Sequence, residues 1–247
     1  MVRANPTWGQ ARIANELSLK LGIQVSPRTV RAYWPDDSRP SRRGSPQTWS
    51  SFIRNHAQAI VACDFMVAVT ARFRILYIFV LLEIGSRRIL HCNVTAHPTA
   101  DWTMQQFREA IPSQHAYRAL IHDRHATFSA ELDQAVENLG IRIVKTPPRA
   151  PQANAYCERL MGTIRRECLD FMIPLNERHV RQILREWVSH YNRGRPHSRL
   201  GPGIPDRETK AAIFRAHRHR FHAHEVVVKR SILGGLHHEY SLEKAAA

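Results

Sequence analysis

The stretch "AIVACDFMVAV" at residues 59–69 decides the fold, together with "FRILYIFVLLEIG" at 73–85 and "RRILHCNVTA" at 87–96. These runs are rich in β-branched and apolar residues, which favour the pleated surface of a β-sheet. Only short breaks separate them, and parallel neighbours would need longer crossover connections. The sequence therefore predicts an antiparallel meander of three strands.

Helices and strands alternate after this meander. We expect a helix at 99–111, a strand at 117–123, a helix at 129–140, a strand at 141–146 and a helix within "APQANAYCERLMGTIRREC" at 150–168. Ser129 is a favourable N-cap and Gly140 a favourable helix end. The order β-β-β-α-β-α-β-α predicts an α/β protein with a sheet of mixed direction.

The composition indicates a folded, strongly basic protein. Of the 247 residues, 43% are hydrophobic and 23% are charged, which is typical of globular chains, and the net charge is +15. A chain this cationic is attracted to polyanions, most commonly nucleic acid, although a ribosomal or membrane-surface protein can be equally basic. No apolar run is long enough to span a bilayer, so no membrane segment is expected.

Cysteine and histidine usage argues against several kinds of site. The four cysteines form no CxxC pair and no secretory signal precedes them, which predicts a reducing cytosol without disulfides or a cysteine-built zinc site. The histidine-rich "HRHRFHAH" at 217–224 is interpreted as a solvated basic surface rather than as a metal site.

The N-terminal residues suggest two short helices. Ile13, Leu17 and Leu21 form one apolar helical stripe, and Ser26 followed by Pro27 is typical of a second helix start. Arg28 and Arg31 on the second helix would then face DNA in a helix-turn-helix arrangement, while an ordinary αα-hairpin stays an equal alternative.

The chain is expected to have four parts. These are a partial helix-turn-helix region at 1–35, a basic linker at 36–54, a core with C-terminal helices at 55–207, and a basic segment at 208–247 with a β-hairpin around Gly234-Gly235.

Three carboxylates are expected at one edge of the sheet. Asp64 interrupts an apolar strand, where an unpaired carboxylate is unfavourable, and Asp123 directly follows the fourth strand. A strand–helix–strand crossover would place that strand parallel to the first and bring Asp64 and Asp123 side by side. Glu158 would reach the same edge from the following helix. Alone, each acid is more simply a turn former or a solvated helix residue.

At these residues the chain resembles the DDE transposases and integrases with a retroviral-integrase-like core, most closely the transposases of bacterial insertion sequences. Asp64 in "ACDF", Asp123 in "IHDRHATF" and Glu158 in "PQANAYCER" match the family's three metal-binding acids. Arg165 matches a basic residue that faces DNA, and "HYNRGRPHSRLG" at 190–201 matches the segment after the core. Ala155 departs from the Gly of many relatives, and the zinc-binding domain of retroviral integrases is absent from the sequence.

The resemblance implies an RNase H-like fold and a DNA strand-transfer enzyme. It implies two Mg²⁺ or Mn²⁺ ions held by Asp64, Asp123 and Glu158, cleavage at transposon ends, and attack of the freed 3′-OH on target DNA. It also implies a homo-oligomer on DNA and a cytoplasmic, nucleoid-associated location in bacteria. The residues expected to contact DNA are Arg159, Arg165, Arg166, Gln152, Asn154, Arg28 and Arg31. A helix lead-in with capping residues is an equal interpretation of Gln152 and Asn154.

Two other functions are considered. A tyrosine recombinase would use the His-x-x-Arg of "HAYR" at 115–118 and a nucleophilic Tyr240, without metal. A catalytically idle DNA-binding remnant would fit the short helix-turn-helix region, which predicts little preference for any terminal DNA sequence. The presence of all three acids favours the enzyme.

Overall fold

The computed structural model describes residues 10–21, 23–35, 53, 55–123, 127–145, 154–197, 200, 203–206 and 225–244. The chain divides into two compact units, Met1–Phe52 and Ile53–Ala247. Most of the basic stretch 36–54, Gln152 and the histidine-rich 217–224 lie outside the described residues.

The first unit contains the two expected helices, α1 (Gln10–Leu21) and α2 (Pro27–Ala32). The Ser26 hydroxyl caps α2 by accepting a hydrogen bond from the Thr29 amide at 3.0 Å. A small apolar cluster of Ile13, Ala14 and Val30 joins the helices. The prediction of two helices is therefore confirmed.

The second unit is built on a five-stranded sheet with the order β3-β2-β1-β4-β5. The strands are β1 (Ile60–Val69), β2 (Ile75–Glu83), β3 (Ile89–Thr95), β4 (Ala119–His122) and β5 (Arg142–Lys145). β1, β2 and β3 pair antiparallel, whereas β4 pairs parallel to both β1 and β5. The mixed sheet and the parallel neighbourhood of β1 and β4 are as predicted.

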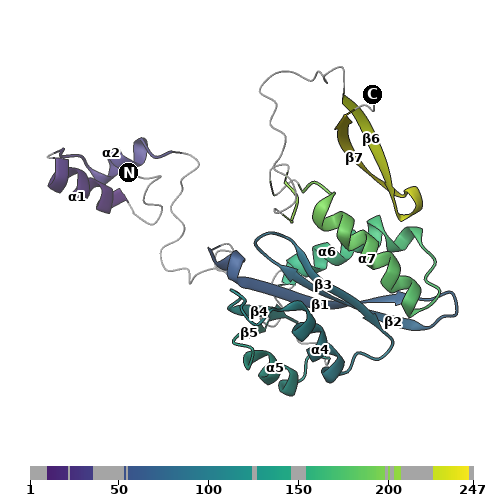
Figure 1. Ribbon diagram of the computed structural model, residues 1–247. Helices are drawn as coiled ribbons and strands as arrows, with labels where there is room; N and C mark the ends of the chain where they lie inside the picture. Colours follow the sequence, from purple (N-terminus) through teal and green to yellow (C-terminus); the bar gives the residue numbers. More distant parts are fainter. Residues whose placement is uncertain are drawn as a thin grey trace. The chain divides into compact units, whose positions relative to one another are not determined.

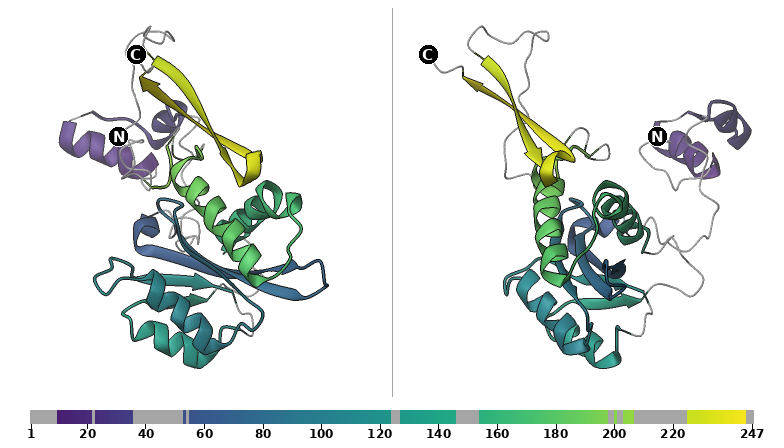
Figure 2. Two further views of the ribbon diagram at one scale, coloured as in Figure 1. Left: turned by 45° about the vertical axis from the view of Figure 1, so that its right-hand side comes forward. Right: turned by 90° about the vertical axis from the view of Figure 1, so that its right-hand side faces the viewer.

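Helices cover both faces of this sheet (Figures 1 and 2). One face carries α4 (Ala100–Ala110) and α5 (Ala130–Glu137), and the other carries α6 (Ala155–Glu167) and α7 (Glu177–Arg193). The Thr99 and Ser129 hydroxyls cap α4 and α5, and Gly140 after α5 has a φ of +83° that suits glycine. None of the helices in the described ranges is long and apolar enough to cross a bilayer.

The core beneath α4 and α5 is aromatic. Phe79 packs edge-on against Phe107 with 5.5 Å between ring centroids, and Phe65 and Trp102 complete the cluster. On the other face, Trp187 of α7 is fully buried, so both tryptophans pack in the core as expected. Successive side chains of β1 point to opposite faces of the sheet, and this alternation decides which face Asp64 points to.

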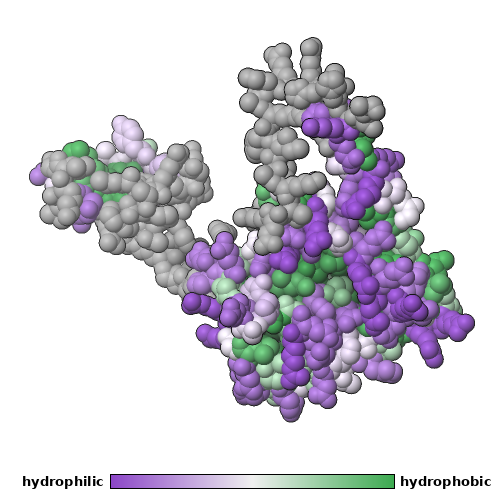
Figure 3. Space-filling model, in the orientation of Figure 1, coloured by the Kyte–Doolittle hydropathy of each residue, from purple (hydrophilic) through white to green (hydrophobic). Residues whose placement is uncertain are grey.

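A β-hairpin of β6 (Glu225–Ile232) and β7 (His237–Lys244) follows, with Gly234 and Gly235 at positive φ in its turn. Glu239 joins it to α7 by accepting a hydrogen bond from His190 at 2.9 Å. Figure 3 shows a largely hydrophilic surface over the second unit, with smaller hydrophobic areas between.

Candidate active site

Asp64 lies in β1 and points to the face that α6 covers. Its neighbours Cys63 and Phe65 belong to the core under α4 and α5, and successive side chains of a strand alternate between faces. The Asp64 Oδ1 accepts from the Phe65 amide at 2.8 Å, and Oδ2 accepts from Asn154 Nδ2 at 3.1 Å. Both carboxylate oxygens therefore have a donor that fixes their orientation.

Asp123 lies directly after the last residue of β4. The parallel pairing of β1 with β4 runs to Ala62 opposite Ile121, so Asp64 and Asp123 each lie two residues beyond the last pair. The two strands thus deliver both acids to the same edge of the sheet, as the sequence predicts.

A buried histidine holds the end of β4. His122 is 1% exposed, and its Nδ1 lies 2.5 Å from the Asp123 carbonyl oxygen. Its Nε2 lies 3.0 Å from Asp133 Oδ1, but the two atoms do not have the geometry of a hydrogen bond. Lys145 forms an ion pair with the other Asp133 oxygen at 2.6 Å. The ring also stacks on Phe128. α5 and β5 therefore brace the backbone that carries Asp123.

Glu158 is exposed in the first turn of α6, the third element at this edge. The N-terminus of α6 is tied to β1, because Asn154 Nδ2 also lies 3.3 Å from the carbonyl oxygen of Cys63. An acidic residue near a helix N-terminus is favoured by the helix dipole. The three acids thus come from two parallel strands and one helix.

The electrostatics of Asp64 indicate that the acids lie near one another. Burial, then the negative charges of Asp123 and Glu158, raise the pKa of the Asp64 carboxyl from 3.8 to about 7, against the lowering effect of the Phe65 amide. Burial likewise raises the pKa of the Cys63 and Cys157 thiols, which stay neutral beside the acids. The edge therefore concentrates negative charge that a cation would relieve.

The carboxylate oxygens of the three acids are ligands of the kind that a hard divalent cation binds. The three side chains do not surround a single point. Within the described residues, no group of three His, Cys, Asp or Glu side chains lies close enough to hold a metal ion. Carboxylate oxygens are the ligands that Mg²⁺ prefers. Burial, followed by the charges of Asp123 and Glu158, raises the pKa of Asp64, and a bound cation would counter both effects. Chemically, the three acids fit a divalent cation.

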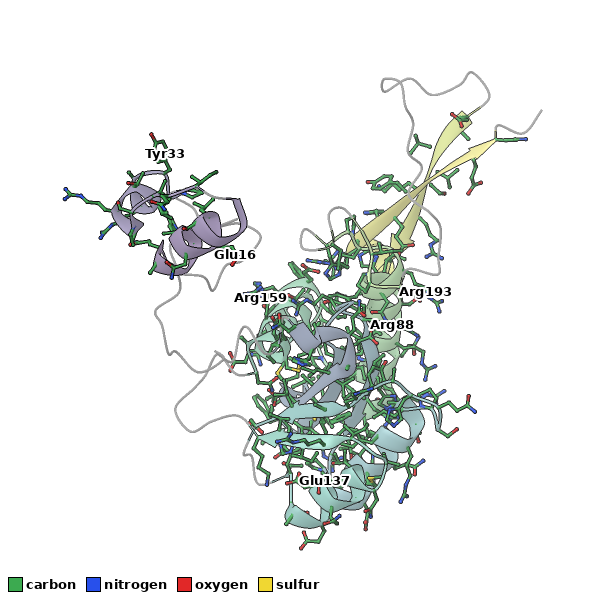
Figure 4. All side chains as sticks on the ribbon, turned by 90° about the vertical axis from the view of Figure 1, so that its left-hand side faces the viewer. Glu16, Tyr33, Arg88, Glu137, Arg159 and Arg193 are labelled. Atoms are coloured by element: carbon green, nitrogen blue, oxygen red, sulfur yellow. The ribbon has the colours of Figure 1, made fainter. Side chains whose placement is uncertain are left out.

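The residues expected to contact DNA separate into two groups. Arg159, Arg165 and Arg166 are exposed on α6, and Figure 4 shows Arg159 on this helix at the surface of the core. Asn154, by contrast, is only 4% exposed and donates to Asp64, so its amide orients a carboxylate rather than facing a DNA backbone. It does not cap α6 with its side chain either.

Two arginines of the second helix in the first unit are exposed. Arg28 and Arg31 both point to solvent on α2, and Arg31 lies in its last turn. These positions suit contact with a polyanion.

Sequence reasoning missed a group of residues beside α6. Arg87 from the β2–β3 turn, Arg195 and His197 after α7, and Tyr156 of α6 line one pocket with Arg159. They come from segments as much as 110 positions apart. Their only local signal is the basic "SRR" at 86–88 and the "RPH" at 195–197.

Comparisons with known proteins point in one direction. Residues 139–205 match the family model described as an integrase core domain. A 62-residue stretch is 39% identical to the insertion element IS476 uncharacterized 39.2 kDa protein of Xanthomonas euvesicatoria, over 25% of this chain and 18% of that protein. The chain therefore matches less than a fifth of that relative's length.

Solved structures of retroviral proteins are similar to this chain, and the match with a TM-score of 0.50 supports a shared fold. A simian T-cell lymphotropic virus intasome in complex with the PP2A regulatory subunit B56 gamma has a chain that matches with a TM-score of 0.50 and 11% identity, covering 100% of this chain and 98% of that one. The BIV integrase catalytic core matches at 0.47 with 18% identity over 60% of this chain and 91% of that one. The HTLV-2 integrase catalytic core in complex with magnesium matches at 0.48 with 13% identity, over 60% and 93%.

Proposed function

We propose that this chain is a DDE transposase or integrase, which cleaves DNA at the ends of a mobile element and transfers the freed strand to target DNA. The match to the integrase core domain model and the likeness to an insertion-element protein support this proposal. The observation that carries it is the position of Asp64, Asp123 and Glu158 at one sheet edge, where burial and the charges of Asp123 and Glu158 raise the pKa of Asp64 to about 7. Packing alone gives no reason for such a concentration of carboxylates.

Asp64, Asp123 and Glu158 would hold the divalent cations, with Mg²⁺ or Mn²⁺ as the candidates. Bound there, two such ions supply the positive charge that favours a hydroxyl nucleophile and stabilises the leaving oxygen of a phosphodiester. In cleavage, water attacks the phosphorus and the 3′-oxygen leaves with a proton. In strand transfer, that 3′-OH attacks a target phosphodiester and displaces another 3′-oxygen, so the number of phosphodiester bonds is conserved.

The protein's own residues orient this site. Asn154 and the Phe65 amide hold the two oxygens of Asp64, and the His122–Asp133–Lys145 group holds the backbone at Asp123. Arg165 lies seven positions after Glu158, two helical turns along the same side of α6. It is therefore placed to bind the phosphate backbone beside the acids.

The partners proposed with this activity are transposon ends and target DNA, bound by a homo-oligomer in the cytoplasm of a bacterium in association with the nucleoid. The exposed arginines of α2 and α6 support binding to DNA phosphates.

A nicking and strand-transfer assay tests the proposal. The full chain is incubated with labelled duplexes carrying candidate element ends, with Mg²⁺, with Mn²⁺ or with EDTA. We expect metal-dependent cleavage that Asp64→Asn, Asp123→Asn and Glu158→Gln each abolish, while Asp170→Asn, a change of an exposed acid, has no effect. Equal cleavage in EDTA, or DNA binding without any cleavage on every substrate, would contradict the proposal and favour the idle DNA-binding alternative.

A further inference from the structure

A pocket of about 190 Å³ lies beside α6, on its side toward α7 and the β2–β3 turn. Its cationic residues are Arg87, Arg159 and Arg195, and Tyr156, Tyr191 and His197 supply ring walls. Burial and the charge of Arg195 lower the pKa of His197, which favours its neutral form. Among the described residues, no Asp or Glu lines the pocket. A concave site with several arginines and no acid attracts an anion.

The positive charges converge on this pocket. The Arg87 guanidinium stacks over the Tyr156 ring with 3.9 Å to its centroid. In the described ranges, neither Arg87 nor Arg159 has a carboxylate within salt-bridge distance. Arg195 is held by two hydrogen bonds to Glu167, of 2.6 and 2.8 Å, which neutralise part of its charge. Arg87 and Arg159 thus leave the pocket a net positive charge.

Arg87 adopts a backbone conformation that side chains rarely take. Its φ is +66°, in the left-handed region that favours glycine. Strain of this kind persists where the surrounding structure enforces it, and it is common at functional sites. Here the strained turn delivers the guanidinium to the ring of Tyr156.

His197 adds a polar atom without a partner. Its ring packs edge-on against Tyr191 at 4.5 Å between centroids. The Nε2 atom is buried and has no hydrogen-bond partner in the described part of the chain. The other ring nitrogen bonds the Tyr191 backbone, so in the neutral ring Nε2 is an acceptor. The imidazole therefore serves as a probe of what enters the pocket.

We propose that this pocket binds a phosphodiester group of DNA through Arg87 and Arg159, beside the ring of His197. Arginine is suited to this ligand because its planar guanidinium donates two parallel hydrogen bonds to phosphate oxygens. A backbone phosphate is favoured over a free anion because the exposed Arg166, seven positions after Arg159 and so on the same side of α6, continues the positive surface of the pocket. The inference rests on the proposed function only in taking DNA as the polyanion.

The bound phosphate is a different one from the phosphate at the acids. At about 100° per residue, Arg159, Thr163 and Tyr156 lie roughly 100°, 140° and 160° around α6 from Glu158. All three line the pocket, whereas Arg165 lies about 20° from Glu158. The two sides of α6 would therefore contact two different phosphates of the DNA. The pocket binds the DNA but takes no part in the cleavage.

Arg87→Gly is a sharp test, because glycine suits the positive φ and the change removes the arginine side chain without adding backbone strain. Arg108→Ala is the matched control, since it removes an exposed arginine from α4 on the other face of the sheet. The full chain is titrated with a fluorescent mixed-sequence duplex in EDTA over a range of salt concentrations. We expect Arg87→Gly to weaken binding about tenfold and to make the slope of log affinity against log salt shallower by about one. Arg108→Ala should change neither quantity.

A second readout is the imidazole signal of His197 in heteronuclear NMR. Addition of the duplex should shift this signal in the wild type and not in Arg87→Gly, with melting temperatures that show both proteins folded. Unchanged DNA affinity and salt slope in Arg87→Gly would overturn the proposal. If inorganic phosphate shifts the His197 signal while the duplex does not, the site takes a free anion and the assignment to DNA is wrong.

The outcome is separable from that of the proposed activity, because binding is measured without metal. Loss of cleavage in Asp64→Asn with unchanged binding in Arg87→Gly refutes the pocket alone. Weakened binding in Arg87→Gly, in a protein that cleaves no substrate, refutes the proposed activity alone.

Discussion

Replacing Asp64 by asparagine should stabilise the protein in the absence of metal while it abolishes cleavage. Burial and the charges of Asp123 and Glu158 raise the pKa of Asp64 from 3.8 to about 7. Since the folded state binds this proton more tightly than the unfolded state, ionisation of Asp64 destabilises the fold. This cost is absent below about pH 4, grows as the pH rises and is complete above about pH 7.

The size of the effect follows from the shift. A change of about three pKa units at ~1.4 kcal/mol each gives about 4 kcal/mol as an upper limit for the cost at pH 8. Asparagine is nearly the same shape but has one acceptor fewer, so one of the hydrogen bonds from Phe65 or Asn154 is lost, at about 1 kcal/mol. We therefore expect Asp64→Asn to raise the free energy of unfolding by about 2–3 kcal/mol, or Tm by roughly 5–10 °C.

Thermal unfolding in EDTA, followed by circular dichroism across pH, measures this gain. The Tm difference between Asp64→Asn and wild type should be small near pH 4 and largest above about pH 7. Adding Mg²⁺ should raise Tm of the wild type and leave the variant nearly unchanged, which narrows the difference. The control Asp170→Asn changes an exposed acid and should show no such pattern. An Asp64→Asn protein that melts at or below the wild-type temperature at pH 8 in EDTA would refute the reasoning.

Three other substitutions test separate parts of the structure. Asn154→Ala removes a donor to Asp64 and should slow cleavage about 10–100-fold, and an unchanged rate would show that Asp64 needs no such support. Arg165→Ala should make the salt dependence of DNA binding shallower by about one phosphate contact, and an unaltered slope places Arg165 away from the backbone. Glu239→Gln weakens the 2.9 Å contact with His190 and should cost about 1–2 kcal/mol, with faster proteolysis of the hairpin as the readout. Equal protection would mean that the other contacts hold it, among them the bonds from Leu233 to Glu186 and between His237 and the Glu167 carbonyl.

Most of the fold could be predicted because its signals are local. The apolar runs that form β1, β2 and β3 are separated by short turns, which leaves an antiparallel meander as the simple solution. Ser26 and Ser129 act as caps in the structure as the sequence predicts, since a cap depends on residues three positions away. α7 was expected only as one of the C-terminal helices of the core, and its bounds were not predicted. Its apolar residues stand at helical spacing after the N-cap Asn176, namely Val180, Ile183, Leu184, Trp187 and Tyr191.

The details of the site could not be predicted, because they depend on distant contacts. Asn154 looks like a helix lead-in, and only the fold reveals that its amide reaches β1 some 90 positions away. The pocket was even harder to predict from the sequence, because Arg87, Arg159 and His197 come from three separate segments. A basic residue in sequence gives charge, but its partner and its direction come from the packing of the elements that carry it.

The position of Asp64 also bears on why an acid is there at all. β1 is buried at its first four residues, and a strand leaving such a core would be satisfied by valine or, with the Phe65 amide nearby, by asparagine. The ionised carboxylate, whose pKa burial and the neighbouring acids raise, should instead lower the stability of the fold. A residue that weakens the fold without metal is best explained by the state in which a cation relieves its charge. The same reasoning does not extend to Glu158, because an exposed carboxylate has little effect on the free energy of unfolding. The role of Glu158 therefore has to be tested by cleavage and not by stability.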